Sequence, residues 1–157
     1  MLSYAFTTLN QGGYEDIATE EFENMHNLFA AILAKGISRQ LKQGLYREYL
    51  NRKEDVADVR GKIDIPGTIQ NRLARKRVLT CEYDELSENN LLNQILKTTV
   101  MLLLRHTRVD QEYKSDLKKE MLFFSNVDTI DPTTIRWSAI RFQRNNNTYR
   151  MLISLCQ

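Results

Sequence analysis

The sequence predicts an α+β fold in which N-terminal helices precede a small antiparallel β-sheet at about residues 45–83, and further helices follow. Two observations support this prediction. Apolar residues recur at helical spacing in residues 1–44 and again in 87–157, and they alternate with polar residues in the stretch between. The regular alternation of strands and helices of a nucleotide-binding fold is not seen. We expect one domain over residues 1–157, helical at 1–44, β-rich at 45–86 and helical at 87–157.

The first block is expected to contain a short helix at residues 2–9 and a long helix that begins after Thr19. Thr19 is a favourable N-cap, and apolar side chains then recur at helical spacing from Phe22 to Leu41. Gly44 follows this pattern, and glycine is common just after the last turn of a helix. The long helix should therefore end near Gly44.

The middle block has the two-residue period of β-strands. Residues 45–50 and 78–83 are rich in residues that favour strands. Between them, residues 59–65 are alternately apolar and charged, so we expect a strand with one buried face and one charged face. The Pro-Gly pair at residues 66–67 should end this strand, and residues 68–77 fit either a short helix or a basic loop. Together these strands should form the small antiparallel sheet.

The third block returns to helical spacing. Ser87 is expected to cap a helix, and a second helix should span about residues 110–124. We expect a short strand at residues 135–142, after Pro132, and a final helix at residues 148–155. The first of these helices has a predicted core stripe of Leu92, Ile95, Leu96, Thr99 and Leu103.

Several classes of function are disfavoured by the sequence. It contains neither GxxxxGK[ST] nor GxGxxG, so we expect no nucleotide cofactor. Its longest apolar stretch, Val100–Leu104, is far shorter than the roughly 20 residues of a membrane span. Cys81 and Cys156 lie far apart and lack the CxxC spacing of a metal or redox site. We therefore expect a cytoplasmic protein with no metal, no cofactor and no membrane contact.

The sequence offers only weak candidates for catalytic residues. The segments EYK at residues 112–114 and DLK at 116–118 partly match the carboxylate–lysine pattern of metal-dependent nucleases. Both fall in a predicted helix with no strand-borne Asp before them, which favours a solvated helix face. His26 and His106 have no nucleophile nearby in the sequence, which favours structural roles. We expect no catalytic residue; a minimal nuclease would instead depend on the lysine of one of these segments.

Four acidic residues also cluster before the third block. They resemble a set of metal ligands only by composition, because a helix is expected directly after them. Acidic side chains stabilise the positive N-terminal end of a helix, and we favour that role here. The cluster consists of Glu82, Asp84, Glu85 and Glu88.

The formal net charge of +2 conceals a gradient along the chain. Residues 1–34 contain five acidic and no Lys or Arg residues, residues 35–77 contain twelve basic and five acidic residues, and the remainder is balanced. Two interpretations stay open: the acidic start and the basic stretch pair with each other, or the basic stretch binds phosphate or an acidic protein surface. The candidate binding residues are Arg60, Lys62, Arg72, Arg75, Lys76 and Arg77.

An ordered set of short motifs resembles the McrC family of DNA restriction proteins over nearly the whole chain. Tyr83-Asp84-Glu85-Leu86-Ser87-Glu88 followed by Asn93-Gln94-Ile95-Leu96-Lys97 is similar to the family's D-x-[LF]-[ST]-E and N-x-[IL]-[IL]-K pattern. The other matching segments are MLSYAF at 1–6, LAKG at 33–36, GL at 44–45, RGKID at 60–64, NTY at 147–149 and ISLC at 153–156.

This resemblance implies a function that the residues alone do not. Proteins of the McrC family pair with McrB, a hexameric AAA+ GTPase that recognises methylated DNA. Their front region docks on the ring and stimulates GTP hydrolysis, and a C-terminal PD-(D/E)xK domain cuts DNA. We expect this chain to correspond to the front region without the nuclease domain, to bind an McrB-type ring and not to cut DNA. The alternative is a stand-alone DNA-binding domain that contacts the phosphate backbone.

Overall fold

The computed structural model describes residues 25–142, 144 and 146–157, which form two compact units. The helical unit contains the described residues up to Tyr46 and those from Leu91 onward, and the β unit spans Arg47–Asn90. The short helix expected at residues 2–9 and the N-cap expected at Thr19 lie outside the described residues.

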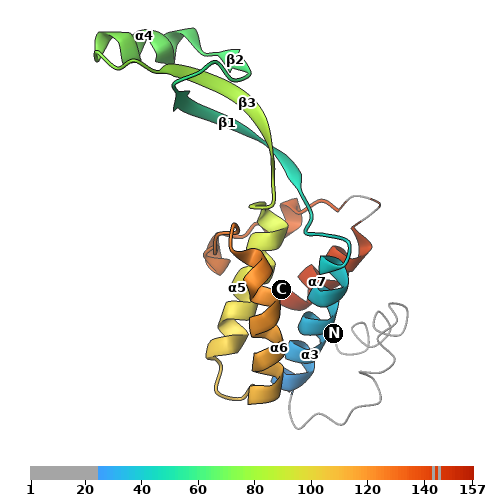
Figure 1. The fold of residues 1–157 in the computed structure, drawn as a ribbon. Coiled ribbons are helices and arrows are strands. Elements are labelled where there is room, and N and C mark those ends of the chain that lie inside the picture. The colour runs from blue at the N-terminus through green and yellow to red at the C-terminus, as the bar shows by residue number, and fades with distance from the viewer. Residues whose placement is uncertain (1–24, 143, 145) are drawn as a thin grey trace. The chain divides into compact units, whose positions relative to one another are not determined.

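The helical unit is built from α3 (Met25–Leu41), α5 (Leu91–Arg105), α6 (Gln111–Met121) and α7 (Asn147–Cys156), which pack on one another (Figure 1). The helices predicted at 110–124 and 148–155 are confirmed, the first being extended by the 3₁₀ turn η1 (Leu122–Phe124). The predicted stripe on α5 lies in the core, with Thr99 and Leu103 at its margin. Fully buried core side chains come from each part of this unit: Leu33, Ile95, Leu117, Phe124 and Leu152.

Polar side chains fix the helices of this unit to one another. Asn27 and Asp110 bond reciprocally: the Asn27 amide donates to the Asp110 carboxylate at 2.6 Å, and the Asp110 backbone N–H donates to Asn27 Oδ1 at 3.0 Å. Lys97 Nζ donates to the backbone carbonyls of Phe124 and Val127. These bonds satisfy backbone groups at helix and turn ends that would otherwise lack partners.

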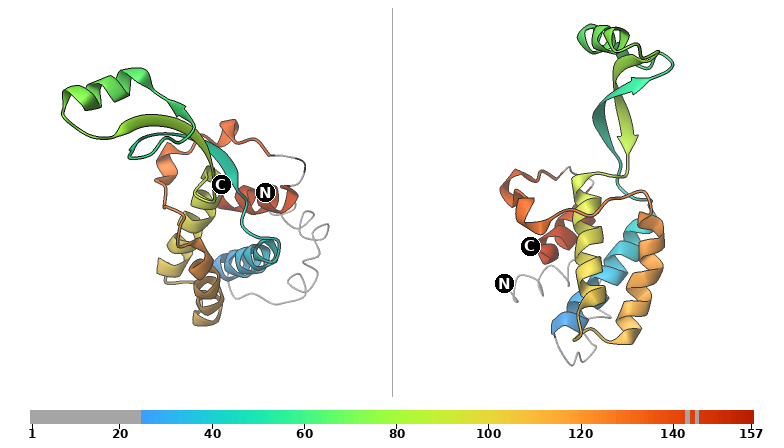
Figure 2. Two further views of the ribbon diagram at one scale, coloured as in Figure 1. Left: turned by 45° about the horizontal axis from the view of Figure 1, so that its top comes forward. Right: turned by 90° about the vertical axis from the view of Figure 1, so that its left-hand side faces the viewer.

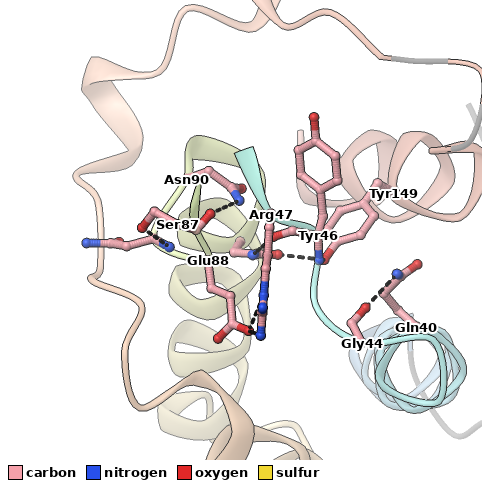
Figure 3. A network of polar contacts seen from close by, with 10 residues as sticks. Gln40, Gly44, Tyr46, Arg47, Ser87, Glu88, Asn90 and Tyr149 are labelled. Atoms are coloured by element: carbon pink, nitrogen blue, oxygen red, sulfur yellow. Dashed lines mark hydrogen bonds and ion pairs between the residues drawn. The ribbon is translucent and has the colours of Figure 1, made fainter. Parts of the chain in front are cut away.

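The end of α3 agrees with the sequence prediction. Gly44 adopts φ of +87°, and its N–H donates to the Leu41 carbonyl at 3.0 Å. Gln40 also donates a hydrogen bond to the Gly44 carbonyl at 3.0 Å (Figure 3). A residue with a Cβ is strained at this φ, so glycine is favoured here and the helix ends.

The strand predicted at residues 135–142 is wrong. The chain forms two 3₁₀ turns in this region, η2 (Pro132–Thr134) and η3 (Trp137–Ala139). Its apolar residues, among them Ile135 and Ile140, pack against the helical core rather than along a strand partner. Alternating apolar residues form a strand only where another strand offers backbone hydrogen bonds, and the described part of this unit provides none.

The β unit contains a three-stranded antiparallel sheet in the order β1-β3-β2. Figure 2 shows the long strands of this sheet in two further views. Its strands are β1 (Glu48–Val56), β2 (Lys62–Ile63) and β3 (Leu79–Ser87), and α4 (Ile65–Leu73) lies between β2 and β3 in the sequence. The small antiparallel sheet is therefore confirmed. The first strand starts later than residue 45 and the third continues beyond residue 83.

The strand predicted at residues 59–65 is mostly wrong, because β2 has only two residues and no buried apolar face. Val59 is 61% exposed and Ile63 is 39% exposed. Gly61 has φ of +67°, and a Cβ at this position would lie 2.5 Å from the Glu82 carbonyl oxygen. This turn delays the start of pairing, and the helix that begins at Ile65 ends it.

Cross-strand polar pairs hold β1 against β3. Arg52 lies 3.3 Å from the Glu85 carboxylate, and the Asn51 amide donates to Asp84 at 3.3 Å. The capping role predicted for the acidic cluster is therefore wrong for its members in β3, whose carboxylates face basic and polar residues of the sheet. Ser87 ends β3, and α5 begins only at Leu91. Opposite polar pairs across strands stabilise a sheet that has few buried apolar residues.

Polar contacts also involve Tyr46, the last residue of the helical unit before the β unit, and the two ends of the β unit (Figure 3). Within the helical unit, the Tyr149 hydroxyl accepts a hydrogen bond from the Tyr46 N–H at 3.0 Å and donates to Asn93 at 2.6 Å. The Asn93 amide donates to the Tyr46 carbonyl at 2.9 Å. Within the β unit, Arg47 pairs with Glu88 at 2.8 Å.

Candidate partner-binding surface

The N-terminus of α4 is fixed by Asp64. Its carboxylate accepts a hydrogen bond from the Gly67 N–H at 2.9 Å and pairs with Lys53 Nζ at 3.0 Å. Pro66 occupies the first turn of α4, where a missing N–H has no cost. The hydrogen bond from Lys53 and the one from Gly67 hold the pKa of Asp64 below its usual value. The Pro-Gly pair thus starts a helix instead of only ending a strand.

The inward face of α4 is polar. Asn71 is buried, and its amide donates to Asp55 Oδ1 at 2.7 Å and to Thr80 Oγ1 at 3.0 Å. The Thr80 hydroxyl donates to the same Asp55 oxygen at 2.7 Å. These bonds from Thr80 and Asn71 lower the pKa of Asp55. Hydrogen bonds among Asp55, Asn71 and Thr80, which we call the polar trio, therefore attach α4 to the sheet.

The outward face of α4 is apolar. Ile65, Ile69 and Leu73 are 66%, 52% and 80% exposed. They are spaced four residues apart, so they lie along one side of the helix, and we call them the apolar stripe. A helix on a protein surface usually buries its apolar side and exposes its polar side. In α4 this arrangement is reversed.

A cationic cluster overlaps the end of the apolar stripe at the C-terminal end of α4. Its members are exposed, and within the part of the chain that the structure describes none of them forms an ion pair. Arg75 has φ of +61°, a left-handed backbone conformation that glycine adopts at lower cost. The cationic cluster consists of Arg72, Arg75, Lys76 and Arg77.

The structure separates the other two predicted binding residues from this cluster. The Arg60 guanidinium carbon lies 4.1 Å from the centre of the Tyr83 ring, and a terminal nitrogen lies 4.0 Å from Glu85. Lys62 is exposed and lies opposite Glu82 in the register of β2 and β3. Because Glu82 and Tyr83 are consecutive in a strand, Lys62 and Arg60 lie on opposite faces of the sheet.

The sequence analysis missed the polar trio and the apolar stripe. The signal for the stripe was present, because Ile65, Ile69 and Leu73 have helical spacing and follow an Asp at the N-cap position and a Pro. Ile65 was instead assigned to the alternating pattern of residues 59–65. No sequence pattern identifies the trio, since Asp55 and Thr80 meet only through the pairing of β1 with β3.

The candidate catalytic residues of the sequence analysis lie elsewhere. The residues of EYK and DLK are on α6, as predicted, where Asp116 pairs with Lys119 at 3.0 Å. His26 and His106 stack with ring centres 4.1 Å apart, and burial followed by the charge of His26 lowers the pKa of His106. Within residues 25–142, 144 and 146–157, no three His, Cys, Asp or Glu side chains are placed to hold a metal ion. None of the helices described there is long and apolar enough to cross a membrane.

Comparison with known proteins identifies relatives over the whole chain. The family model described as "McrBC 5-methylcytosine restriction system component" matches residues 1–157. The chain is 22% identical over 157 residues to the type IV methyl-directed restriction enzyme EcoKMcrBC of Escherichia coli strain K12. This match covers 100% of the chain and 45% of the relative, so the chain spans less than half the length of that protein.

Two solved structures share the fold. A chain of the Thermococcus gammatolerans McrBC complex aligns with a TM-score of 0.74 and 25% identity, over 97% of this chain and 49% of that one. A chain of the half-complex from a tetradecameric assembly of Thermococcus gammatolerans McrB AAA+ hexamers with bound McrC aligns with a TM-score of 0.71 and 26% identity. The second alignment covers 88% of this chain and 33% of that chain.

Proposed function

Because this chain belongs to the McrBC family of 5-methylcytosine restriction system components, we propose that it binds an McrB-type AAA+ GTPase ring and stimulates its GTP hydrolysis. The similar solved structures are complexes that contain McrB, one of them with McrB AAA+ hexamers and bound McrC, which supports a partner of this type. We further propose that the activity is cytoplasmic and that this chain by itself does not cut DNA.

The cationic cluster is the observation that carries this proposal. Its four basic side chains are exposed, and none of them forms an ion pair with another described residue. An exposed Arg can form two parallel hydrogen bonds to a phosphate or to a carboxylate. An activating protein typically places such a charge near the phosphates of the nucleotide, where charge develops during hydrolysis.

The cluster is a better candidate than Arg60 or Lys62. Arg60 is already engaged with the Tyr83 ring and Glu85, and Lys62 faces Glu82. We therefore assign the stimulating role to Arg72, Arg75, Lys76 or Arg77, and a stabilising role within the sheet to Arg60.

The direct test is to mix the chain with its cognate McrB-type GTPase and measure the rate of GTP hydrolysis. We expect stimulation, and we expect the substitution to Gln of at least one cluster residue to lower it by about tenfold or more. The matched control is Lys118→Gln on α6, an exposed lysine outside the β unit. An unchanged rate and no co-elution of the two proteins would contradict the proposal.

DNA binding is a second candidate function, favoured by the same exposed cluster. If the cluster contacts several phosphates, the affinity for DNA should fall by orders of magnitude as the salt concentration rises. A gel-shift titration at two salt concentrations measures this dependence. Incubation with DNA and Mg²⁺ tests cleavage in the same samples, and a minimal nuclease would lose activity on substitution of Lys114 or Lys118.

A further inference from the structure

The apolar stripe of α4 has no counterpart inside its own unit. The inward face of the helix is attached through Asn71 to Asp55 and Thr80, and the sheet position that α4 covers is therefore polar. Turning the helix to bury the stripe would break these bonds and leave the Asp55 carboxylate facing apolar side chains. The polar trio thus keeps the apolar side of α4 turned outward.

Single exposed apolar residues are common on protein surfaces, but an aligned set on one helix is not. All members of the stripe are more than half exposed, and Leu73 at its C-terminal end is 80% exposed. Apolar residues repeated at four-residue spacing are the contact pattern of a helix that binds in an apolar groove. The cationic cluster begins at Arg72, so any surface that receives Leu73 also meets several positive charges.

We propose that the apolar stripe is the anchor of the β unit on its AAA+ partner, and that it binds an apolar groove with an acidic margin in the partner's ring. This inference rests on the proposed function, and it assigns separate roles to the apolar stripe and to the cationic cluster. Burial of Ile65, Ile69 and Leu73 supplies affinity, and the cationic cluster supplies the charge that acts on the margin and on hydrolysis.

Charge complementarity indicates which kind of partner binds α4. A second copy that paired through the same stripe would present another cationic cluster and no acidic margin for the first. A nucleic acid would accept the cluster but has no apolar groove for three aligned aliphatic side chains. A protein surface that is apolar at its centre and acidic at its edge satisfies both features of α4.

The test uses the full chain and an McrB-type hexamer held with a non-hydrolysable GTP analogue. Ile69 and Leu73 are changed together to Ser, and affinity is measured by fluorescence anisotropy of the labelled chain. We expect binding to weaken by about tenfold or more, because anchor residues carry most of the affinity of an interface. The chain concentration needed for half-maximal stimulation of GTP hydrolysis should rise in parallel. Circular dichroism confirms that α4 remains folded, and Leu73→Gln repeats the test with an uncharged, strong helix former.

The matched control is Leu122→Ser, which removes an apolar side chain that is 78% exposed in the helical unit. It should leave affinity unchanged. If the double variant binds as tightly as the wild type, the stripe is not the anchor, whereas the proposed function stands. If the wild-type chain itself fails to bind the hexamer, both are overturned. Raised salt should weaken wild-type binding, and Arg77→Gln should reduce that salt dependence; binding indifferent to salt would refute the acidic margin.

Discussion

The two units of this protein distribute apolar and polar residues in opposite ways. The helical unit buries Leu117, Phe124 and Leu152 completely, and its hydrogen bonds link the ends of packed helices. The β unit buries Asn71 and Thr80 and leaves Leu73 in contact with water. The difference indicates that apolar side chains stabilise the fold in one unit and remain available for binding in the other.

The comparison also separates two uses of buried polar groups. In the helical unit, Tyr149 and Asn93 bond both the N–H and the carbonyl of Tyr46, within a core that is otherwise apolar. In the β unit, the polar trio connects helix and sheet, together with the hydrogen bond from the Thr80 N–H to the Thr68 hydroxyl. A hydrogen bond adds to the stability of the first unit, whereas in the second it determines which side of α4 faces outward.

The largest expected difference is between two leucines. Leu117→Ala in the helical unit should lower the free energy of unfolding by about 2–5 kcal/mol, because it removes buried methyl groups and leaves a cavity. Leu73→Ala in the β unit should change it by no more than about 0.5 kcal/mol, because the side chain is already exposed. Urea unfolding monitored by circular dichroism measures the free energy of unfolding of both variants. Similar losses would show that the two leucines contribute equally to stability and that the two units do not differ in this way.

The next effect concerns the polar trio. Asn71→Ala should reduce the local stability of α4 by about 1–3 kcal/mol, because Thr80 and Asp55 lose a buried partner. Amide hydrogen exchange within α4 measures this change. Gln70→Ala, at the exposed neighbouring position, is the control and should stay within about 0.5 kcal/mol of the wild type. Equal exchange rates in the two variants would show that the trio does not hold the helix.

Acid should affect the two units in different ranges of pH. Burial and His26 lower the pKa of His106 from 6.5, so the folded helical unit favours the neutral ring. Its contribution is present above pH 6.5 and is lost as pH falls below that value. The pKa of Asp55 and that of Asp64 are lowered from 3.8, so their contributions are present above pH 3.8 and are lost as pH falls through the folded-state values.

Fluorescence of Trp137 and amide exchange in α4 report on the two units separately. Between pH 7 and 5 the helical unit should lose stability while α4 does not. His106→Asn should remove the dependence of the helical unit on pH in this range. A slope that persists in the variant would assign it to another group.

The smallest expected effect is on the stability of α4, and it has opposite signs at Arg75 and Arg72. Arg75→Gly should raise the stability of α4 by about 1 kcal/mol or less, because glycine adopts its positive φ without strain. Arg72→Gly, inside the last helical turn, should lower it by about 0.5–1 kcal/mol. Both remove one charge of the cationic cluster. If Arg75→Gly stabilises the chain and also reduces GTPase stimulation, the residue is retained for binding at a cost in stability.

The sequence was most informative where local patterns and packing agree. The end of α3 at Gly44, the core stripe of α5, and the positions of α6 and α7 follow from periodicity and from glycine chemistry, and all are confirmed. These features depend on residues close together in the chain, and the buried face of each helix agrees with its sequence pattern.

The sequence was least informative where polar contacts replace an apolar core. The alternation at residues 59–65 predicted a buried strand face, but Gly61 and the cap at Asp64 leave a strand of two residues. The acidic residues of β3 were assigned to a helix N-terminus, because their basic partners, such as Arg52, are distant in the sequence. The cluster at residues 72–77 was identified from composition, but its separation from Arg60 required the register of the sheet.

The pairing of Glu48 with Ser87 and the contact between Arg47 and Glu88 close the β unit at its two ends. A segment that departs and returns at adjacent points can change in length during evolution without displacing any helix. Such changes must occur in matched steps on β1 and β3, because a shift of one residue exchanges the two faces of the ribbon. Insertions or deletions of two residues on each strand therefore preserve which side chains lie on each face of the ribbon.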